Sequence, residues 1–222
     1  MNVFDIIGPV MVGPSSSHTA GAVRIGRIAR MLLGEEPAEA VIKLHGSFAK
    51  TYKGHGTDKA LIGGLMGFSV DDARLRVSME LADKAGFAYT FETGSLGPVH
   101  PNTAYIDVRG ASGKTASIMG SSVGGGNIVI TQVNGVDVEF TGQYYTLIIC
   151  HNDAPGAVAA VTNVLAAVNI NIAFMKVYRT LKGGKAMMVI ETDQPIDDEV
   201  SVIIKRVPRV SSATIVKPIS QE

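Results

Sequence analysis

The sequence predicts an α+β protein of two domains, because the pattern of its 222 residues changes near residue 142. Residues 144–217 follow the order βαββαβ, the split arrangement of ferredoxin-like domains, in which two helices cover one face of an antiparallel sheet. The residues before 142 mix helical and strand patterns. We therefore expect a mixed α/β domain over residues 1–142 and a ferredoxin-like domain over residues 143–222.

Composition sets broad limits on function. The chain is 46% hydrophobic, which is enough for a core, and its formal net charge is zero, which gives no reason to expect nucleic acid or an acidic membrane surface as a partner. No apolar run is long enough to cross a bilayer, and no signal-peptide pattern is evident at the N-terminus. The one cysteine, Cys150, cannot form an internal disulfide, so we expect a cytoplasmic protein.

The first domain is predicted from apolar periodicity and from its turn residues. Residues 46–58 contain three glycines, three serine or threonine side chains and one histidine, which is typical of a loop, and residues 94–103 contain two prolines and two glycines. Asn134-Gly135 predicts a two-residue hairpin turn. We expect helices over residues 18–33, 58–68 and 71–85, and strands over residues 40–46, 87–91, 104–109, 114–121, 126–133 and 136–141.

The second domain has the more regular pattern. A turn at residues 151–156 opens its first helix, and Pro195 begins its second helix. Lys182-Gly183-Gly184 predicts a turn between its two middle strands. We expect strands over residues 144–150, 170–180, 185–192 and 210–216, and helices over residues 156–168 and 195–206.

The richest group of reactive side chains lies at the start of the first helix. Ser15, Ser16, Ser17, His18 and Thr19 follow a proline and lead into the helical pattern. A helix N-terminus with free N–H groups and hydroxyls favours an anion, and a nearby histidine can move a proton near neutral pH. This predicts a pocket for a small carboxylate. The alternative is an ordinary helix cap beside an exposed histidine.

Two further segments carry the same kinds of side chain. His55 and Thr57 lie in the glycine-rich stretch, and His100 and Asn102 lie in the proline-rich loop. Three polar, glycine-framed or proline-framed segments with one histidine each predict a single shared site for a small polar substrate. The sequence leaves open which histidine acts as the base.

The second domain holds a candidate amino-acid site of its own. His151 and Asp153 precede its first helix, and Asn171 lies at the start of the next strand. Ordinary capping and turn chemistry is the alternative explanation. We predict no metal ligand in this chain, and we expect Cys150 to be a small buried residue.

Four motifs occur in a recognisable order: Gly13-Pro14-Ser15-Ser16-Ser17-His18-Thr19, Gly54-His55-Gly56-Thr57-Asp58, His100-Pro101-Asn102 and Gly124-Gly125-Gly126. Together they resemble the β region of iron–sulfur-dependent L-serine dehydratases, which is the β subunit in the two-chain form. The resemblance covers nearly the whole chain. The serine–histidine–threonine motif is specific, whereas the triple glycine alone is not.

The resemblance implies a reaction, the conversion of L-serine to pyruvate and ammonia without pyridoxal phosphate. In the family, a 4Fe–4S cluster binds the substrate hydroxyl while a base removes the α proton, and the cysteines that hold the cluster belong to the α subunit. The resemblance thus implies L-serine as substrate, an α subunit as partner, a 4Fe–4S cluster ligated by that partner, and inactivity of this chain alone.

The matching motifs also imply roles for particular residues. His18 would be the leading acid/base candidate, with His55 and His100 behind it. The side chains that would contact the substrate or order the pocket are Ser15, Ser16, Ser17, Thr19 and Asn102.

Both domains carry a second resemblance. The first is similar to the domain that binds an allosteric serine in some phosphoglycerate dehydrogenases, and residues 144–217 resemble an ACT domain. His151 and the Asn171-Ile172-Ala173 stretch match serine-binding ACT domains, whereas Asp153 stands where an asparagine is usual. We expect two ACT domains to pair edge to edge. Two other functions remain open: a serine-sensing regulatory module without catalysis, and a structural partner whose loops serve assembly.

Overall fold

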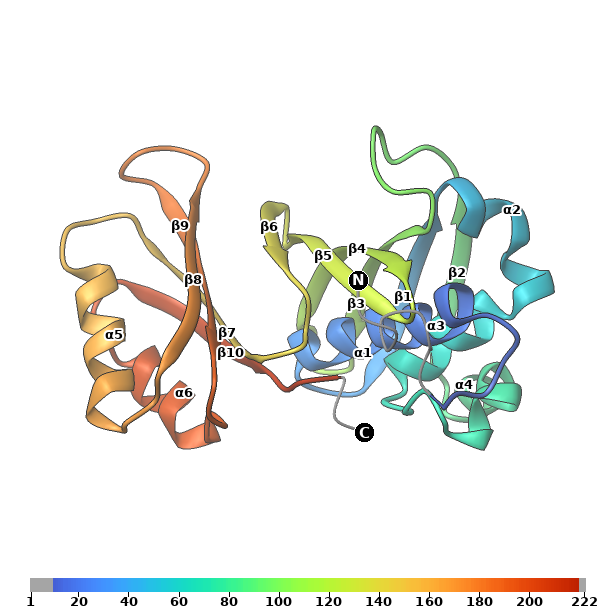
Figure 1. The fold of residues 1–222 in the computed structure, drawn as a ribbon, viewed down its shortest axis with the longest axis horizontal. Helices are drawn as coiled ribbons and strands as arrows, with labels where there is room; N and C mark the ends of the chain where they lie inside the picture. The colour runs from blue at the N-terminus through green and yellow to red at the C-terminus, as the bar shows by residue number, and fades with distance from the viewer. Residues whose placement is uncertain (1–9, 220–222) are drawn as a thin grey trace. The chain divides into compact units, whose positions relative to one another are not determined.

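The computed structural model describes residues 10–219, which Figure 1 draws as a ribbon. Contacts divide the chain between Gly135 and Val136; the strand that begins at Val136 is described below with the sheet that it extends. The predicted domain boundary after residue 142 stays a prediction. Among the described residues, no helix is both long and apolar enough to cross a membrane.

A six-stranded sheet with the strand order β2-β1-β3-β4-β5-β6 organises the first part of the chain. Strand β1 runs parallel to β2 and antiparallel to β3, so the sheet has both strand directions. The elements in chain order are the short π-helix η2 (Ser16–Ala20), α1 (Gly21–Leu33), β1 (Pro37–Leu44), α2 (Gly46–His55), α3 (Thr57–Leu65), the 3₁₀-helix η3 (Ala73–Val77), α4 (Ser78–Lys84), β2 (Ala88–Thr93), β3 (Thr103–Gly110), β4 (Thr115–Gly124), β5 (Asn127–Val133) and β6 (Val136–Phe140).

One face of this sheet carries the core. Ile42 on β1 and Ile106 on β3 are fully buried, and alternate residues of each strand share that face. Helix α1 packs against β3 and β4, with Ile25 and Ile28 buried. Because η2 leads straight into α1, the packing of α1 fixes the position of the serine–histidine segment.

Helices α1 and α3 approach each other closely through glycines. A Cβ built on Gly64 of α3 would collide with the carbonyl oxygen of Val23, and one on Gly26 of α1 would lie 2.5 Å from the carbonyl oxygen of Leu61. Gly64 of α3 and Gly26 of α1 therefore serve helix packing, which offsets the weak helix propensity of glycine.

The loop predicted over residues 46–58 is wrong, because residues 46–55 form helix α2. Gly46 adopts φ +57°, and the N–H groups of Ser47 and Phe48 donate to the carbonyl oxygen of Pro101 at 2.8 and 3.4 Å. Phe48 is fully buried. The helix begins with help from a distant segment, and it ends at Gly56, whose φ is +68°.

The helix predicted over residues 71–85 is interrupted. It consists of η3 followed by α4, because Val77 at their junction has φ −120° and ψ 19°, outside the helical region. At the start of η3, the carboxylate of Asp72 accepts from the Arg74 N–H at 2.8 Å.

The second unit has the expected βαββαβ order. Its elements are β7 (Tyr145–Asn152), α5 (Ala157–Ala167), β8 (Ile172–Arg179), β9 (Lys185–Thr192), α6 (Asp198–Lys205) and β10 (Val210–Val216). The four strands form an antiparallel sheet in the order β10-β7-β9-β8. Both helices lie on the same face of this sheet, as Figure 1 shows. The predicted ferredoxin-like arrangement is confirmed.

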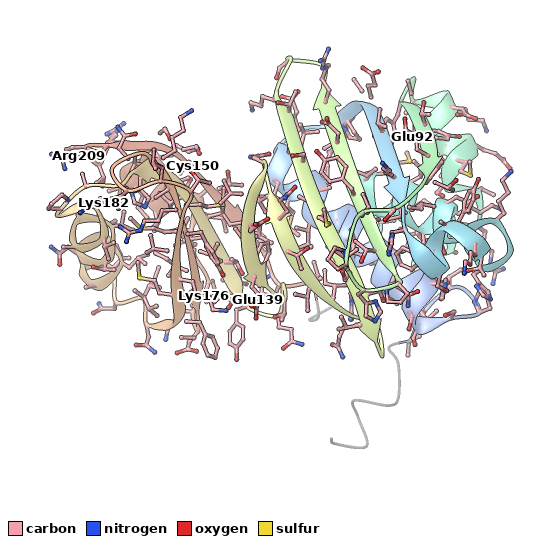
Figure 2. All side chains as sticks on the ribbon, turned by 90° about the horizontal axis from the view of Figure 1, so that it is seen from above. Glu92, Glu139, Cys150, Lys176, Lys182 and Arg209 are labelled. Carbon is pink, nitrogen blue, oxygen red and sulfur yellow. The ribbon has the colours of Figure 1, made fainter. Side chains whose placement is uncertain are left out.

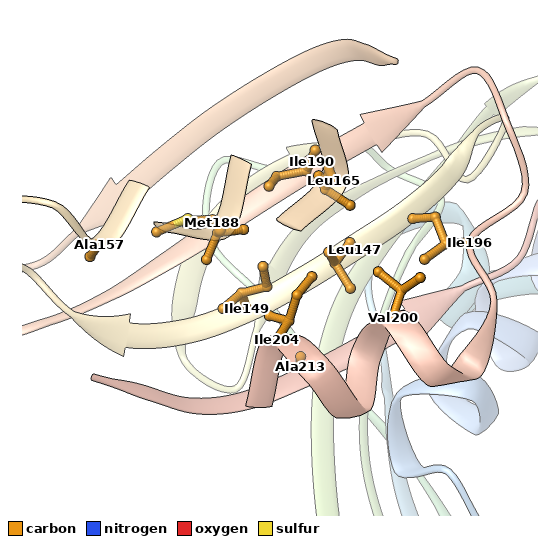
Figure 3. Packing of buried hydrophobic residues seen from close by; sticks show 11 residues of the cluster. Leu147, Ile149, Ala157, Leu165, Met188, Ile190, Ile196, Val200, Ile204 and Ala213 are labelled. Carbon is orange, nitrogen blue, oxygen red and sulfur yellow. The ribbon is translucent and has the colours of Figure 1, made fainter. Parts of the chain in front are cut away.

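The core of this unit fills the space between that sheet and its two helices. Leu147, Met188 and Ile190 of the sheet pack with Leu165 of α5 and Ile204 of α6 (Figure 3). Burial of such side chains contributes roughly 1.5–3 kcal/mol each.

Candidate functional site

His18 lies inside η2, where Ser15 is the capping residue. The backbone N–H of His18 donates to Ser15 Oγ at 3.2 Å, and the ring nitrogen Nδ1 lies 3.4 Å from the same oxygen. The predicted cap is therefore present, and it also contacts one side of the histidine ring. Ser16 and Ser17 are half-buried, and their hydroxyls make no hydrogen bond with the described residues.

The other ring nitrogen of His18 contacts a residue that the sequence did not single out. His18 Nε2 lies 3.2 Å from Ser47 Oγ, in the first turn of α2. Ser47 also donates its backbone N–H to Pro101. Ser47 therefore links the serine–histidine segment to the proline-rich loop.

His55 completes a histidine pair. Its ring centroid lies 4.6 Å from that of His18, and the backbone carbonyl of His55 accepts from Thr19 Oγ1 at 3.4 Å. The edge of the His18 ring meets Phe48, with the ring centroids 5.4 Å apart. His55 Nδ1 is buried and finds no partner among the described residues. Two of the three predicted segments thus meet at these rings.

The environment of His18 keeps its ring neutral. Burial lowers the pKa of His18 below its usual value of 6.5, and the nearby His55 lowers it further. A neutral imidazole can accept a proton at pH 7, which suits a general base or a member of a proton-transferring pair.

A cavity of about 520 Å³ opens beside this pair. Thr19, Gly54, His55 and Gly56 are among its lining residues, while His18 is not. His55 is therefore the histidine of the pair that lines the cavity. The glycines beside it leave room for a ligand to approach the backbone.

The third predicted segment joins the site only in part. His100 is exposed, and its Nδ1 accepts from the N–H of Asn102 at 3.1 Å within the same turn. It makes no ring contact with His18 or His55 among the described residues. Asn102 Oδ1 is buried without a partner in the described part of the chain, and the backbone carbonyl of Asn102 accepts from the Ser122 N–H at 2.9 Å. The sequence predicts that three histidines share one site. The structure brings two of them together, His18 and His55.

The candidate site of the second unit is divided. His151 is buried, with Nδ1 2.9 Å from the carbonyl oxygen of Asn152, and Nε2 has no partner among the described residues. Asp153 accepts from the N–H of Gly183 at 3.0 Å and from Arg179 at 3.2 Å, and these hydrogen bonds lower the pKa of its carboxyl.

Asn171 lies apart from His151 and Asp153 in the same chain. Asn171 Nδ2 donates to the Asp193 carboxylate at 2.6 Å, at the start of β8, whereas Arg179 is the last residue of that strand. An eight-residue strand separates Asn171 from the Asp153–Arg179 pair.

The residues of this chain do not fit an iron–sulfur cluster. Within residues 10–219, no three His, Cys, Asp or Glu side chains gather as metal ligands. Cys150 lies on β7 and is half-buried rather than fully buried as expected (Figure 2). A cluster held by several thiolates requires cysteines from another chain.

Comparisons with known proteins match both parts of the chain to family models. A family model described as serine dehydratase beta chain matches residues 2–88, and an ACT domain model matches residues 144–208. The "Probable L-serine dehydratase, beta chain" of Bacillus subtilis (strain 168) is 46% identical over 213 residues, which are 96% of both chains. The "L-serine dehydratase, beta chain" of Peptoniphilus asaccharolyticus is 38% identical over 97% of this chain and 98% of its own.

A more distant relative is the D-3-phosphoglycerate dehydrogenase of Bacillus subtilis (strain 168), which is 26% identical over 88% of this chain and 37% of its own length. The matched stretch is thus little more than a third of that longer protein. The two more similar relatives match almost end to end. The chain therefore belongs to the family of L-serine dehydratase beta chains.

Proposed function

We propose that this chain is the β subunit of an iron–sulfur-dependent L-serine dehydratase, which converts L-serine to pyruvate and ammonia at a site completed by an α subunit. The observation that carries the proposal is the His18–His55 pair beside a cavity, in a chain whose relatives are named for this reaction. The 4Fe–4S cluster would be ligated by the α subunit, because the described residues supply no ligand set.

The substrate carboxylate would bind at the start of η2. The hydroxyls of Ser16 and Ser17 have no partner in the described structure, and both residues lie in the first turn of a helix that continues into α1, ahead of the N–H of His18 that Ser15 caps. Free N–H groups at a helix N-terminus and hydroxyl donors together favour an anion.

His55 is the better candidate for the proton acceptor, ahead of His18. His55 lines the cavity, while both ring nitrogens of His18 already contact serine hydroxyls. His18 would hold the His55 ring in place, since the centroids of the two rings lie 4.6 Å apart. The α proton of serine would move to His55, and the remaining step at Cβ would depend on the partner chain.

Reconstitution tests this function. The chain, mixed anaerobically with the cysteine-bearing partner and iron, should form pyruvate from L-serine, and neither chain alone should do so. A fully loaded two-chain complex without serine turnover would exclude the proposal.

A second function is favoured by the match to a phosphoglycerate dehydrogenase, namely a serine-sensing module without catalysis. It predicts serine binding by the isolated chain in calorimetry and no turnover in any complex.

We also propose that the second unit associates with a copy of itself through β8. This strand lies at the edge of the sheet, and Phe174 and Val177 are 55% and 41% exposed. Antiparallel pairing of two β8 strands would bring Asn171 of one copy toward Asp153 and His151 of the other, which would assemble the divided effector site. Sedimentation of Phe174→Lys would test the pairing, because the variant should be monomeric under conditions where the unchanged chain is a dimer.

A further inference from the structure

Three cationic side chains surround the cavity beside His55. Lys53 comes from the last turn of α2, Lys59 from the first turn of α3, and Arg76 from η3. The described residues that line this cavity include no aspartate and no glutamate.

No carboxylate of the described residues forms an ion pair with these three charges. Lys53, Lys59 and Arg76 are exposed and form no ion pair with residues 10–219. Nearby Arg74, in contrast, pairs with Asp72 at 2.6 Å. Like charges around a concave wall reinforce one another, so the cavity attracts anions.

L-Serine alone does not match this cavity in charge or in size. The amino acid is a zwitterion with no net charge, and its ammonium group would meet three cations. A cavity of about 520 Å³ has room for roughly 17 water molecules at ~30 Å³ each, and it lies in the range of sites for ligands several times larger than serine.

We propose that this cavity receives an acidic segment of the α subunit, whose carboxylates pair with Lys53, Lys59 and Arg76. The inference rests on the proposed function, in which an α subunit completes the site. That subunit must then reach His55, which lines this cavity. A peptide segment with carboxylates fits both the volume and the unbalanced positive charge. Its entry would bring partner residues next to the histidine pair and exclude water from it.

Charge reversal tests the inference. The variant K53E/K59E/R76E removes the positive cavity, and K84E/K205E/R206E makes the same change in net charge at three exposed cations away from the cavity that have no ion pair in the described structure. The association rate of each purified chain with the purified α subunit is measured at low and high salt, and serine KM is measured in each assembled complex.

We expect the unchanged chain and the control to associate rapidly at low salt, and at least tenfold more slowly at high salt. The cavity variant should associate at least tenfold more slowly than the control at low salt and should lose most of the salt dependence, with serine KM unchanged once assembled. If the cavity variant does not fold, K53Q/K59Q/R76Q replaces it, with a smaller effect in the same direction.

Equal association rates of the cavity variant and the control would overturn the inference. If serine KM rises in that case, the cavity binds the substrate carboxylate instead. Failure of the proposed function gives a different result, because then the unchanged chain itself forms no pyruvate with the α subunit.

Discussion

The hydroxyl of Ser47 lies 3.2 Å from His18 Nε2, and the backbone N–H of the same serine donates to Pro101. Ser47, at the start of α2, thus contacts both His18 and the proline-rich loop that contains Pro101. Its role is to position His18, which in turn packs against His55.

Replacing Ser47 with alanine should therefore weaken turnover more than substrate binding. The ring of His18 would lose one of its two hydrogen-bonding contacts, which we expect to lower kcat about 10-fold to 100-fold through misplacement of the pair. Steady-state kinetics of the assembled complex check this, with serine KM expected to change less than threefold.

Ser95→Ala is the matched control, because that hydroxyl accepts only from Gly97 within an exposed loop. Ser47→Thr, which keeps the hydroxyl, should recover most of the rate. If Ser47→Ala keeps the full kcat, Ser47 has no positioning role.

The stability of the chain should depend on the charge of His18. Burial, followed by the neighbouring His55, lowers the pKa of His18 in the folded state below 6.5, so the unfolded chain binds the proton more readily. The stabilising contribution is complete above pH 6.5 and is lost as the pH falls through the lower, folded pKa.

Urea unfolding at pH 7 and pH 5 measures this effect. The unchanged chain should lose more unfolding free energy between these pH values than His18→Gln, which cannot titrate. An equal loss in both proteins would show that His18 does not carry the pH dependence.

The three histidines should differ in importance. His100 is exposed and contacts only its own turn, whereas His55 lines the cavity and meets His18. We expect His100→Ala to reduce kcat/KM less than tenfold, and His55→Ala to reduce it 100-fold or more, the range typical of a lost general base. A larger effect at His100 than at His55 would reverse this assignment.

The packing of α1 against α3 should tolerate no added side chain at Gly64. A Cβ there would meet backbone atoms of Val23 and Arg27, so Gly64→Ala should cost about 1–3 kcal/mol of unfolding free energy. Gly54→Ala is the control, because its Cβ meets no atom within 4 Å. Urea unfolding of both variants is the measurement, and equal stability would contradict the close approach.

The sequence predicts the second unit well, because its alternating strands and turn residues act locally. All six elements of residues 144–217 occur in the expected order. The Asn134-Gly135 hairpin turn also occurs, with φ +48° and +76°. In these places the pattern of neighbouring residues determines the structure.

The sequence prediction fails where distant segments decide the structure. Helix α2 resembles a loop because its sequence contains glycines, and its first N–H groups depend on Pro101, more than fifty residues away. Ser47 was missed for the same reason, since its contact with His18 spans 29 residues. If residues 46–55 are recognised as a helix, Ser47 lies in its first turn and His55 in its last turn, and this pattern would have singled out Ser47.

The initial rate of pyruvate formation from L-serine tests the central claim most directly. It is measured for the anaerobically assembled two-chain complex containing either the unchanged chain or His55→Ala, with cluster absorbance recorded for both. The account predicts turnover by the unchanged complex and a loss of 100-fold or more in His55→Ala at equal absorbance. Equal rates in the two complexes, or no turnover in a fully loaded unchanged complex, would contradict it.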